Sequence, residues 1–362
     1  MQGSRAGAKG SPLVHFRSPL VRFRSPLAAL LLLAATATLP GCARGRPPAA
    51  PPPPPAEGQP PAADPAPSLP PPADPVPTAG GSRAPQPATP PVPTPEVALE
   101  PEEVSQGRWL MVRVRGTPGP VTGDLAEFGP LHFFRHGGEF RALAAVPAAA
   151  APGPRSVTVR WPGGEWQGEV RVAPYPFPED RITVAPGQAA SLDDPRAAEE
   201  ALLLRRLRSQ GGGPPLWDGP FELPLRTDPP RITTQFGEIR YVNGRRTGQH
   251  SGLDLGAPEG TPVYAPAPGR VVLARELLIT GNTVLLDHGA NLFSLYGHLS
   301  AIAVAEGDRV VRGQVLGAVG STGLSTGPHL HWSVYVGNVA TDPTQAMTAA
   351  LSPPPPPEFT PD

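Results

Sequence analysis

The chain of 362 residues contains a single cysteine, Cys42, and a single lysine, Lys9. One cysteine cannot form a disulfide within the chain, and it cannot build the closed thiolate site of a structural zinc domain. The formal net charge is only −1, so the composition gives no indication of a nucleic-acid partner. Long apolar runs are also missing. The run over residues 27–37 is too short for a transmembrane helix, which needs about 20 apolar residues.

The surroundings of Cys42 are typical of an export signal. Three basic residues precede the apolar run, namely Arg17, Arg22 and Arg24, and Leu39-Pro40-Gly41-Cys42 follows it. This order resembles a bacterial lipoprotein signal peptide, in which the cysteine becomes the lipidated first residue. We therefore expect a signal peptide over residues 1–41 and a membrane anchor at Cys42. With Ala43 next, the resemblance implies the cell envelope, at the outer membrane facing the periplasm. The alternative is an ordinary secretory signal with an incidental cysteine.

Proline is abundant, with 57 residues concentrated over 47–95 and 353–357. Such segments have few large apolar side chains, so burial cannot offset the entropy lost on ordering. The composition predicts a disordered Pro/Ala-rich linker over residues 42–96 and a disordered tail over residues 351–362.

Short strand-like runs between Gly-Gly and Pro-Gly turns occupy residues 97–175. They cover residues 109–115, 131–134, 140–143, 155–160 and 165–172. This spacing predicts a small immunoglobulin-like β-sandwich. His132 and His136 have no partner ligand at a useful spacing, so we interpret them as ordinary histidines.

Residues 176–224 are predicted to connect two domains and to contain one helix, at about residues 195–210. Asp193 or Asp194 can cap its start, Pro195 suits its first turn, and Gly211 can end it. Its apolar residues do not make a clean stripe. A connecting helix is therefore the simpler interpretation, and an autoinhibitory or partner-binding segment is the alternative.

From residue 225 to residue 350 the sequence alternates strands with glycine-rich turns. Candidate strands cover residues 232–236, 269–273, 283–287, 292–296, 309–310, 315–319 and 329–336. The pattern predicts a mostly antiparallel β domain, and the fold class of the whole chain is mainly β.

This domain contains five of the eight histidines, and four of them lie in three motifs: His250-Ser-Gly-Leu-Asp254, Tyr296-Gly-His298-Leu299 and Gly327-Pro-His329-Leu-His331. Histidine and aspartate are zinc ligands, and a catalytic zinc takes three protein groups and leaves one position for water. The motifs supply three such groups with two histidines to spare, and a surplus histidine can transfer protons near neutral pH. No His-Glu-x-x-His helix is present. The motifs predict a divalent-metal hydrolase site.

Residues 231–343 resemble the M23 (LytM/lysostaphin-like) metallopeptidase domain. Further matching motifs are Thr234-Gln-Phe-Gly237, Ala257-Pro-Glu-Gly-Thr-Pro-Val-Tyr264, Gly281-Asn-Thr-Val-Leu-Leu-Asp-His-Gly289 and Gly320-Ser-Thr-Gly-Leu-Ser-Thr-Gly-Pro-His-Leu-His331. The resemblance implies that His250, Asp254 and His331 bind Zn²⁺ and that His298 and His329 are catalytic. It leaves open which of these two is the base. The implied substrate is bacterial peptidoglycan, cut in its stem peptides or cross-links.

Two other functions remain as alternatives to the zinc endopeptidase. One is a non-catalytic LytM-type regulator that binds and activates a cell-wall amidase, and the other is a wall-anchoring module with structural zinc. The complete set of ligands and partner histidines favours the enzyme. Whether a protein regulator gates the site stays open. We interpret His288 as a hydrogen-bonded structural residue and Tyr296 as core packing.

Overall fold

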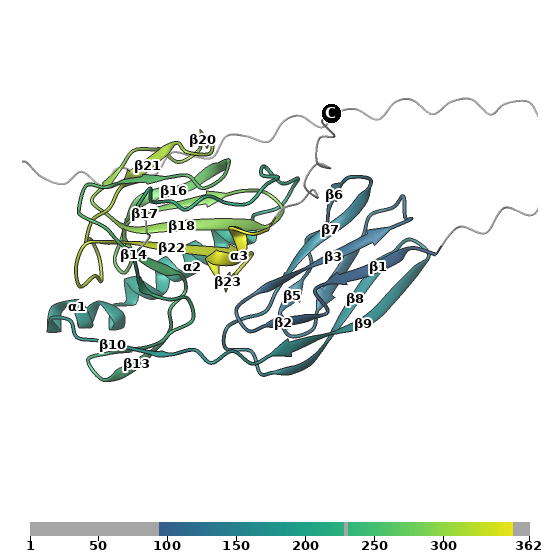
Figure 1. The fold of residues 1–362 in the computed structure, drawn as a ribbon, viewed down its shortest axis with the longest axis horizontal. Coiled ribbons are helices and arrows are strands. Elements are labelled where there is room, and N and C mark those ends of the chain that lie inside the picture. The colour runs from purple at the N-terminus through teal and green to yellow at the C-terminus, as the bar shows by residue number, and fades with distance from the viewer. Residues whose placement is uncertain (1–93, 228–230, 350–362) are drawn as a thin grey trace, which may run out of the picture. The chain divides into compact units, whose positions relative to one another are not determined.

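The computed structural model describes residues 94–227 and 231–349, and within them the fold is mainly β, as predicted. Figure 1 shows two groups of sheets, joined in the chain by a segment with a long helix. In the two described ranges, no helix has the length and apolar character that crossing a bilayer requires. The proposed signal, Cys42, the Pro-rich linker up to residue 93 and the Pro-rich tail lie outside the described residues.

The first group of strands forms two sheets, in which every pair except β2 with β9 is antiparallel. The four-stranded sheet has the order β1 (Glu96–Glu100), β3 (Trp109–Arg115), β7 (Glu139–Ala145), β6 (Phe134–His136). The five-stranded sheet has the order β2 (Glu103–Ser105), β9 (Gly164–Ala173), β8 (Gly153–Trp161), β4 (Thr122–Leu125), β5 (Gly129–Pro130).

One apolar core joins these two sheets into a sandwich. Val112 and Val114 of β3 are buried in the same cluster as Val157 of β8 and Val170 of β9. Alternate residues of each strand reach this core because successive side chains of a strand point to opposite faces. Kinship with immunoglobulin domains stays a prediction.

The strand expected over residues 131–134 is wrong. Residues 131–133 have no strand conformation, and β6 begins only at Phe134. The reason is topological: β5 belongs to one sheet and β6 to the other, so the intervening residues cross between the sheets. A crossing segment cannot pair along its length with either sheet.

The second group is built on one large antiparallel sheet. Its order is β11 (Ile232–Thr234), β14 (Leu253–Gly256), β22 (His329–Val336), β18 (Leu292–Leu299), β17 (Gly281–Asp287), β16 (Gly269–Leu277), β20 (Arg309–Val310), with β23 (Val339–Thr341) also paired to β22. Two three-stranded sheets accompany it. They are β15 (Pro262–Tyr264), β21 (Val315–Ala318), β19 (Ala301–Ile302), and β10 (Glu179–Ile182), β12 (Ile239–Val242), β13 (Arg245–Gln249).

The central strands of the large sheet are covered on both faces. Every residue of β18 is buried. Its Leu292 and Tyr296 belong to the main core, whereas Phe293 and Leu295 belong to a separate cluster on the other face. Burial on both faces explains why most residues of β18 are apolar, with Ser294 and His298 as its buried polar side chains.

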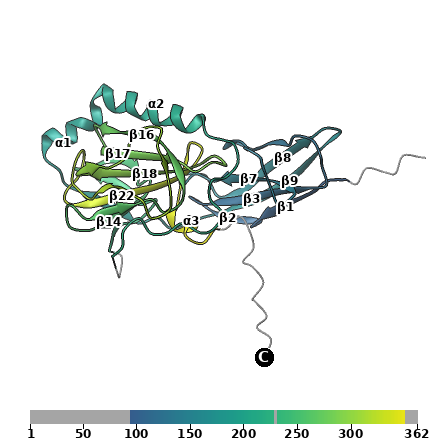
Figure 2. The same cartoon turned by 90° about the horizontal axis from the view of Figure 1, so that it is seen from above.

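Four helical segments complete the described part of the chain, and α2 is the longest of them. They are α1 (Pro186–Ala190), η1 (Ser191–Asp193), α2 (Pro195–Ser209) and α3 (Pro343–Ala346). The Asp194 side chain accepts a hydrogen bond from the Arg196 backbone N–H at 2.9 Å, which caps the start of α2. Leu203, Leu204 and Leu207 of α2 pack on the cluster that contains Phe293. Figure 2 shows α2 running along this face of the sheet.

Candidate metal centre and its cleft

Strand pairing places Asp254 beside His331. β14 and β22 are antiparallel neighbours, and Asp254 is the register partner of His331. His250 lies four residues before Asp254, at the start of the short loop that leads from β13 into β14. The loop is held by two backbone hydrogen bonds, from the His250 N–H to the Glu238 carbonyl and from the Gly237 N–H to the His250 carbonyl, each 2.8 Å.

Gly252 allows this loop to lie against β22. A Cβ at position 252 would lie 2.3 Å from the carbonyl oxygen of Trp332 and 2.6 Å from the Ser333 hydroxyl. Real Cβ atoms do not approach other atoms so closely, so only glycine fits here. The close approach brings His250 and Asp254 to the residues of β22.

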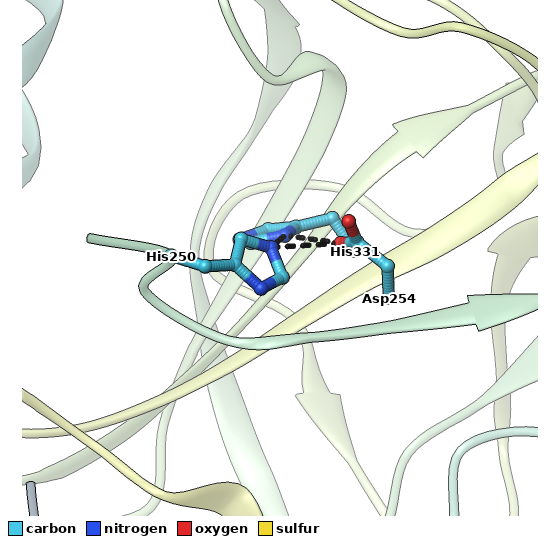
Figure 3. Close-up of side chains that lie close together, drawn as sticks. All are labelled: His250, Asp254 and His331. Carbon is cyan, nitrogen blue, oxygen red and sulfur yellow. Dashed lines mark hydrogen bonds and ion pairs between the residues drawn. The ribbon is translucent and has the colours of Figure 1, made fainter. Parts of the chain in front are cut away.

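The side chains of His250, Asp254 and His331 converge on one point, as Figure 3 shows. His250 Nε2 lies 2.9 Å from Asp254 Oδ1 and 3.0 Å from His331 Nδ1. His331 Nδ1 lies 2.9 Å from Asp254 Oδ1. Atoms at this spacing can share one ion at the usual Zn–N distance of about 2.0–2.1 Å.

The hydrogen bonds behind these side chains favour a cation at the centre. His250 Nδ1 lies 2.9 Å from the Gln235 carbonyl oxygen, which can only accept, so a neutral His250 directs the lone pair of Nε2 to the centre. His331 Nε2 lies 2.8 Å from the Ser333 hydroxyl. When His331 donates there, its Nδ1 lone pair also faces the centre. Two lone pairs and a carboxylate oxygen at about 3 Å repel unless a cation lies among them, so the residues fit a divalent metal.

Asp254 is stabilised as a carboxylate although it is only 4% exposed. Burial by itself would raise the pKa of Asp254, but in the absence of a metal ion, when the two rings donate to it, hydrogen bonds and charge interactions with His250 and His331 lower it well below its usual range. Its other oxygen, Oδ2, pairs with Arg240 at 3.3 Å, and Arg240 in turn pairs with Asp180 at 2.8 Å. Burial lowers the pKa of His331, which favours the neutral form that a metal ligand requires.

His298 and His329 lie beside this centre. Their ring centroids are 4.7 Å apart, and His329 Nε2 lies 3.8 Å from Asp254 Oδ1. Each Nδ1 is held by a backbone carbonyl: His298 by Thr322 at 2.8 Å and His329 by Gly327 at 2.7 Å. With Nδ1–H donated to a carbonyl, the neutral form of each ring presents Nε2 as a proton acceptor.

The backbone of His298 is unusual and its ring is buried. His298 has φ 61°, a conformation that few non-glycine residues adopt, and its N–H donates to the Thr280 carbonyl at 2.6 Å. Burial lowers the pKa of His298 to about 3, assisted by the neighbouring His331 and His329. Strained conformations of this kind cluster at functional sites.

A cleft opens beside three of these five side chains. It has a volume of about 150 Å³ and is lined by His250, His298 and His331, with Arg240 and Thr280 at its walls. A substrate group could therefore approach the point where the three side chains converge.

The remaining candidates of the sequence have other surroundings. His288 is fully buried and bonds the Pro268 carbonyl and the Ser294 hydroxyl, while the hydroxyl of the buried Tyr296 also bonds Ser294. His132 is exposed in the sandwich. These placements agree with structural interpretations.

Two groups that support the metal site, Ser333 and Arg240, were not predicted from the sequence. Ser333 follows His331 by two residues, so strand periodicity alone could have indicated it. Arg240 comes from a separate hairpin, and no local pattern indicates its contact with Asp254.

Comparison with known proteins agrees with the geometry. Residues 248–343 match the profile described as peptidase family M23. The chain is 40% identical over 122 residues to peptidoglycan DD-endopeptidase ShyA of Vibrio cholerae, covering 33% of this chain and 28% of that protein. It is also 40% identical over 130 residues to DD-carboxypeptidase/endopeptidase Mpg of Neisseria meningitidis, covering 36% of this chain and 29% of that protein.

The match therefore spans less than a third of the length of these curated relatives. A crystal structure from Pseudomonas aeruginosa, described as peptidase M23, is 30% identical and matches 68% of this chain and 95% of its own, with a TM-score of 0.49. The family match lies in the domain that contains His250, Asp254 and His331.

Proposed function

We propose that this protein is a zinc-dependent endopeptidase that hydrolyses peptide bonds in the stem peptides or cross-links of peptidoglycan. The observation that carries the proposal is the convergence of His250 Nε2, Asp254 Oδ1 and His331 Nδ1 within 3.0 Å of one another. The substrate class is supported by the relatives, which are named peptidoglycan DD-endopeptidase and DD-carboxypeptidase/endopeptidase.

In this proposal His250, Asp254 and His331 hold the metal. Zinc bound there would lower the pKa of a coordinated water and polarise a substrate carbonyl. Asp254 supplies the one negative charge of the ligand set, and Arg240 fixes its second oxygen. Gln235 and Ser333 fix the orientations of the two imidazoles from behind.

The two other histidines would move the protons. Because Nδ1 of each ring is tied to a carbonyl, Nε2 is free to accept the proton of the attacking water. We assign this step to His329, whose side chain is 14% exposed and therefore more accessible than the buried His298. The same Nε2–H can then donate to the leaving amine nitrogen. His298, opposite it, also presents an Nε2 lone pair and would accept a hydrogen bond from the attacking water, which would orient that water.

The anchor and the location belong to the proposal as well. Lipidation at Cys42 would hold the protein at the outer membrane, on the periplasmic side, next to the polymer that it cuts. A mass measurement on the mature N-terminal peptide tests this part by itself.

The decisive experiment is digestion of purified peptidoglycan by the full-length protein, with and without a chelator. We expect chelator-sensitive release of peptide-cut fragments, and we expect His329→Ala to abolish release while His132→Ala, the same change on the sandwich, preserves it. Fragments that His329→Ala leaves unchanged would exclude the proposed enzyme and favour a regulator of another hydrolase. A cut between the lactyl group and the peptide would instead place the reaction among amidases.

A further inference from the structure

A second, larger cavity adjoins the metal centre. It has a volume of about 490 Å³ and lies between α2 and the large sheet. Ser251, Ile279, Thr280 and His331 line both this cavity and the cleft beside the metal centre. A ligand that occupies the second cavity, which we call the α2 groove, would therefore extend up to a metal-centre residue.

The α2 groove contains a buried arginine without a counter-ion. Arg208 is only 6% exposed and lines the groove. Its Nε has no hydrogen-bond partner, and no ion pair holds its guanidinium within residues 94–227 and 231–349. Its one defined contact is with the ring of Tyr335, whose centroid lies 4.2 Å from Cζ.

The surrounding charges increase the need for an anion. Arg205, one turn earlier on α2, adds a second positive side chain to the groove. Glu200 is the acidic residue of the groove wall, but its carboxylate accepts a hydrogen bond from the Leu278 N–H at 2.8 Å. Burial lowers the pKa of Arg208, and Arg205 lowers it further against the opposing effect of Tyr335. A guanidinium nevertheless remains charged in proteins, so the groove contains an uncompensated cation.

An unpaired buried charge is costly, and folded chains normally pair such groups. The sandwich of this chain shows the usual solution, because buried Glu139 pairs with Arg113, Arg115 and Arg141. A charge kept unpaired inside a cavity next to a reaction centre is instead typical of a ligand-binding group.

We infer that the α2 groove is a carboxylate subsite in which the Arg208 guanidinium binds an acidic group of the substrate. The inference rests on the proposed function for the identity of that substrate. Stem peptides of peptidoglycan carry free carboxylates, and the planar guanidinium can bind a carboxylate through two parallel N–H···O bonds. Arg208 would thus position the peptide while the histidines act on the bond to be cut.

The test is equilibrium binding to the full-length protein. The probe is the synthetic stem tripeptide L-alanyl-γ-D-glutamyl-diaminopimelate, which has no D-Ala–D-Ala bond. Two analogues of this peptide, one amidated only on glutamate and the other only on diaminopimelate, identify which carboxylate is recognised. We expect amidation of the recognised carboxylate to weaken binding about tenfold or more, as expected for a charge-assisted hydrogen bond.

Three variants assign the effect to the groove. Arg208→Met should remove the preference for the free carboxylate, and Arg208→Lys should retain part of it. Arg206→Met is the matched control, because Arg206 is an exposed arginine of the same helix outside the groove, and it should keep the full preference. Since Arg208 is unpaired, Arg208→Met should unfold at the same temperature as the wild type or higher.

The inference is overturned if the wild type does not distinguish the free from the amidated peptides, or if Arg208→Met keeps the preference. If Arg208→Met loses the preference and also unfolds at a lower temperature than the wild type, the Arg208→Lys variant distinguishes the explanations. Preference for the free carboxylate in Arg208→Lys supports the subsite, and its absence overturns the subsite. None of these outcomes depends on hydrolysis. If the protein cleaves peptidoglycan but the Arg208→Met variant still prefers the free carboxylate, the proposed function stands and only the subsite is overturned.

Discussion

The substitution Gly252→Ala is the sharpest test of how the fold builds the metal centre. The new Cβ would lie 2.3 Å from the Trp332 carbonyl oxygen, whereas an ordinary contact begins at about 3.4 Å. The loop must therefore move away from β22 by about 1 Å. That loop connects His250 to Asp254, and β22 carries the third residue, His331.

A shift of this size is large for a metal site, where ligand distances are held to within about 0.2 Å. We expect Gly252→Ala to weaken zinc binding by about 100-fold or more, and to cost about 1–3 kcal/mol in the free energy of unfolding from the steric strain. The matched control is Gly327→Ala. A Cβ at position 327, in the loop before His329, would meet nothing within 4 Å.

The assay is competition for zinc against a chromophoric chelator, with the unfolding free energy measured in parallel by denaturant titration. Gly327→Ala should retain zinc affinity within about threefold of the wild type. If Gly252→Ala bound zinc as tightly as the wild type, the close approach of this loop to β22 would not be what positions the ligands, and the reasoning would be refuted.

Three other perturbations have defined outcomes. Zinc at about 1,000 times its dissociation constant should add about 4 kcal/mol to the stability of the peptidase domain and raise its Tm by roughly 10 °C, as checked by calorimetry with and without chelator. Burial alone would raise the pKa of Glu139, but hydrogen bonds from Arg115, Arg113 and Arg141 lower it to about 2 from 4.5. Denaturant titrations should thus find the wild type about 2 kcal/mol more stable than Glu139→Gln at pH 6, and this advantage should disappear as the pH falls from about 4.5 through 2; a constant difference would contradict the assignment. Leu285→Ala should cost about 2–5 kcal/mol in the same assay, because this fully buried side chain fills the cluster under α2.

The mainly β fold and the match to the M23 family were predictable because their signals are local. A strand places residues two apart on one face, so His329 and His331 could be grouped from their spacing alone. Glycine and proline in the segment from His250 to Gly260 are typical of turns at the ends of a strand, and the structure has β14 there. The family motifs fix the order of these elements along the chain.

What the sequence did not predict depends on contacts between distant elements. The apolar residues of α2 form no clean stripe, and Leu202 is 62% exposed, yet Leu203, Leu204 and Leu207 pack on the large sheet. The pairing of Arg240 with Asp254 joins a hairpin to β14 across the site. No periodicity within one segment encodes such a contact.

The alternation of a single strand links the metal centre to the α2 groove. On β22 the even-numbered residues Leu330, Trp332, Val334 and Val336 all belong to the main core. The odd-numbered residues face the other side and include His331, Ser333 behind it, and Tyr335 beneath the Arg208 guanidinium. Because the core fixes one face of β22, a shift of its pairing register by one residue would turn both His331 and Tyr335 away from their present positions. The rigid strand thus sets the spacing between the bond to be cut and the proposed carboxylate subsite, so changes at Tyr335 should alter peptide preference without altering zinc affinity.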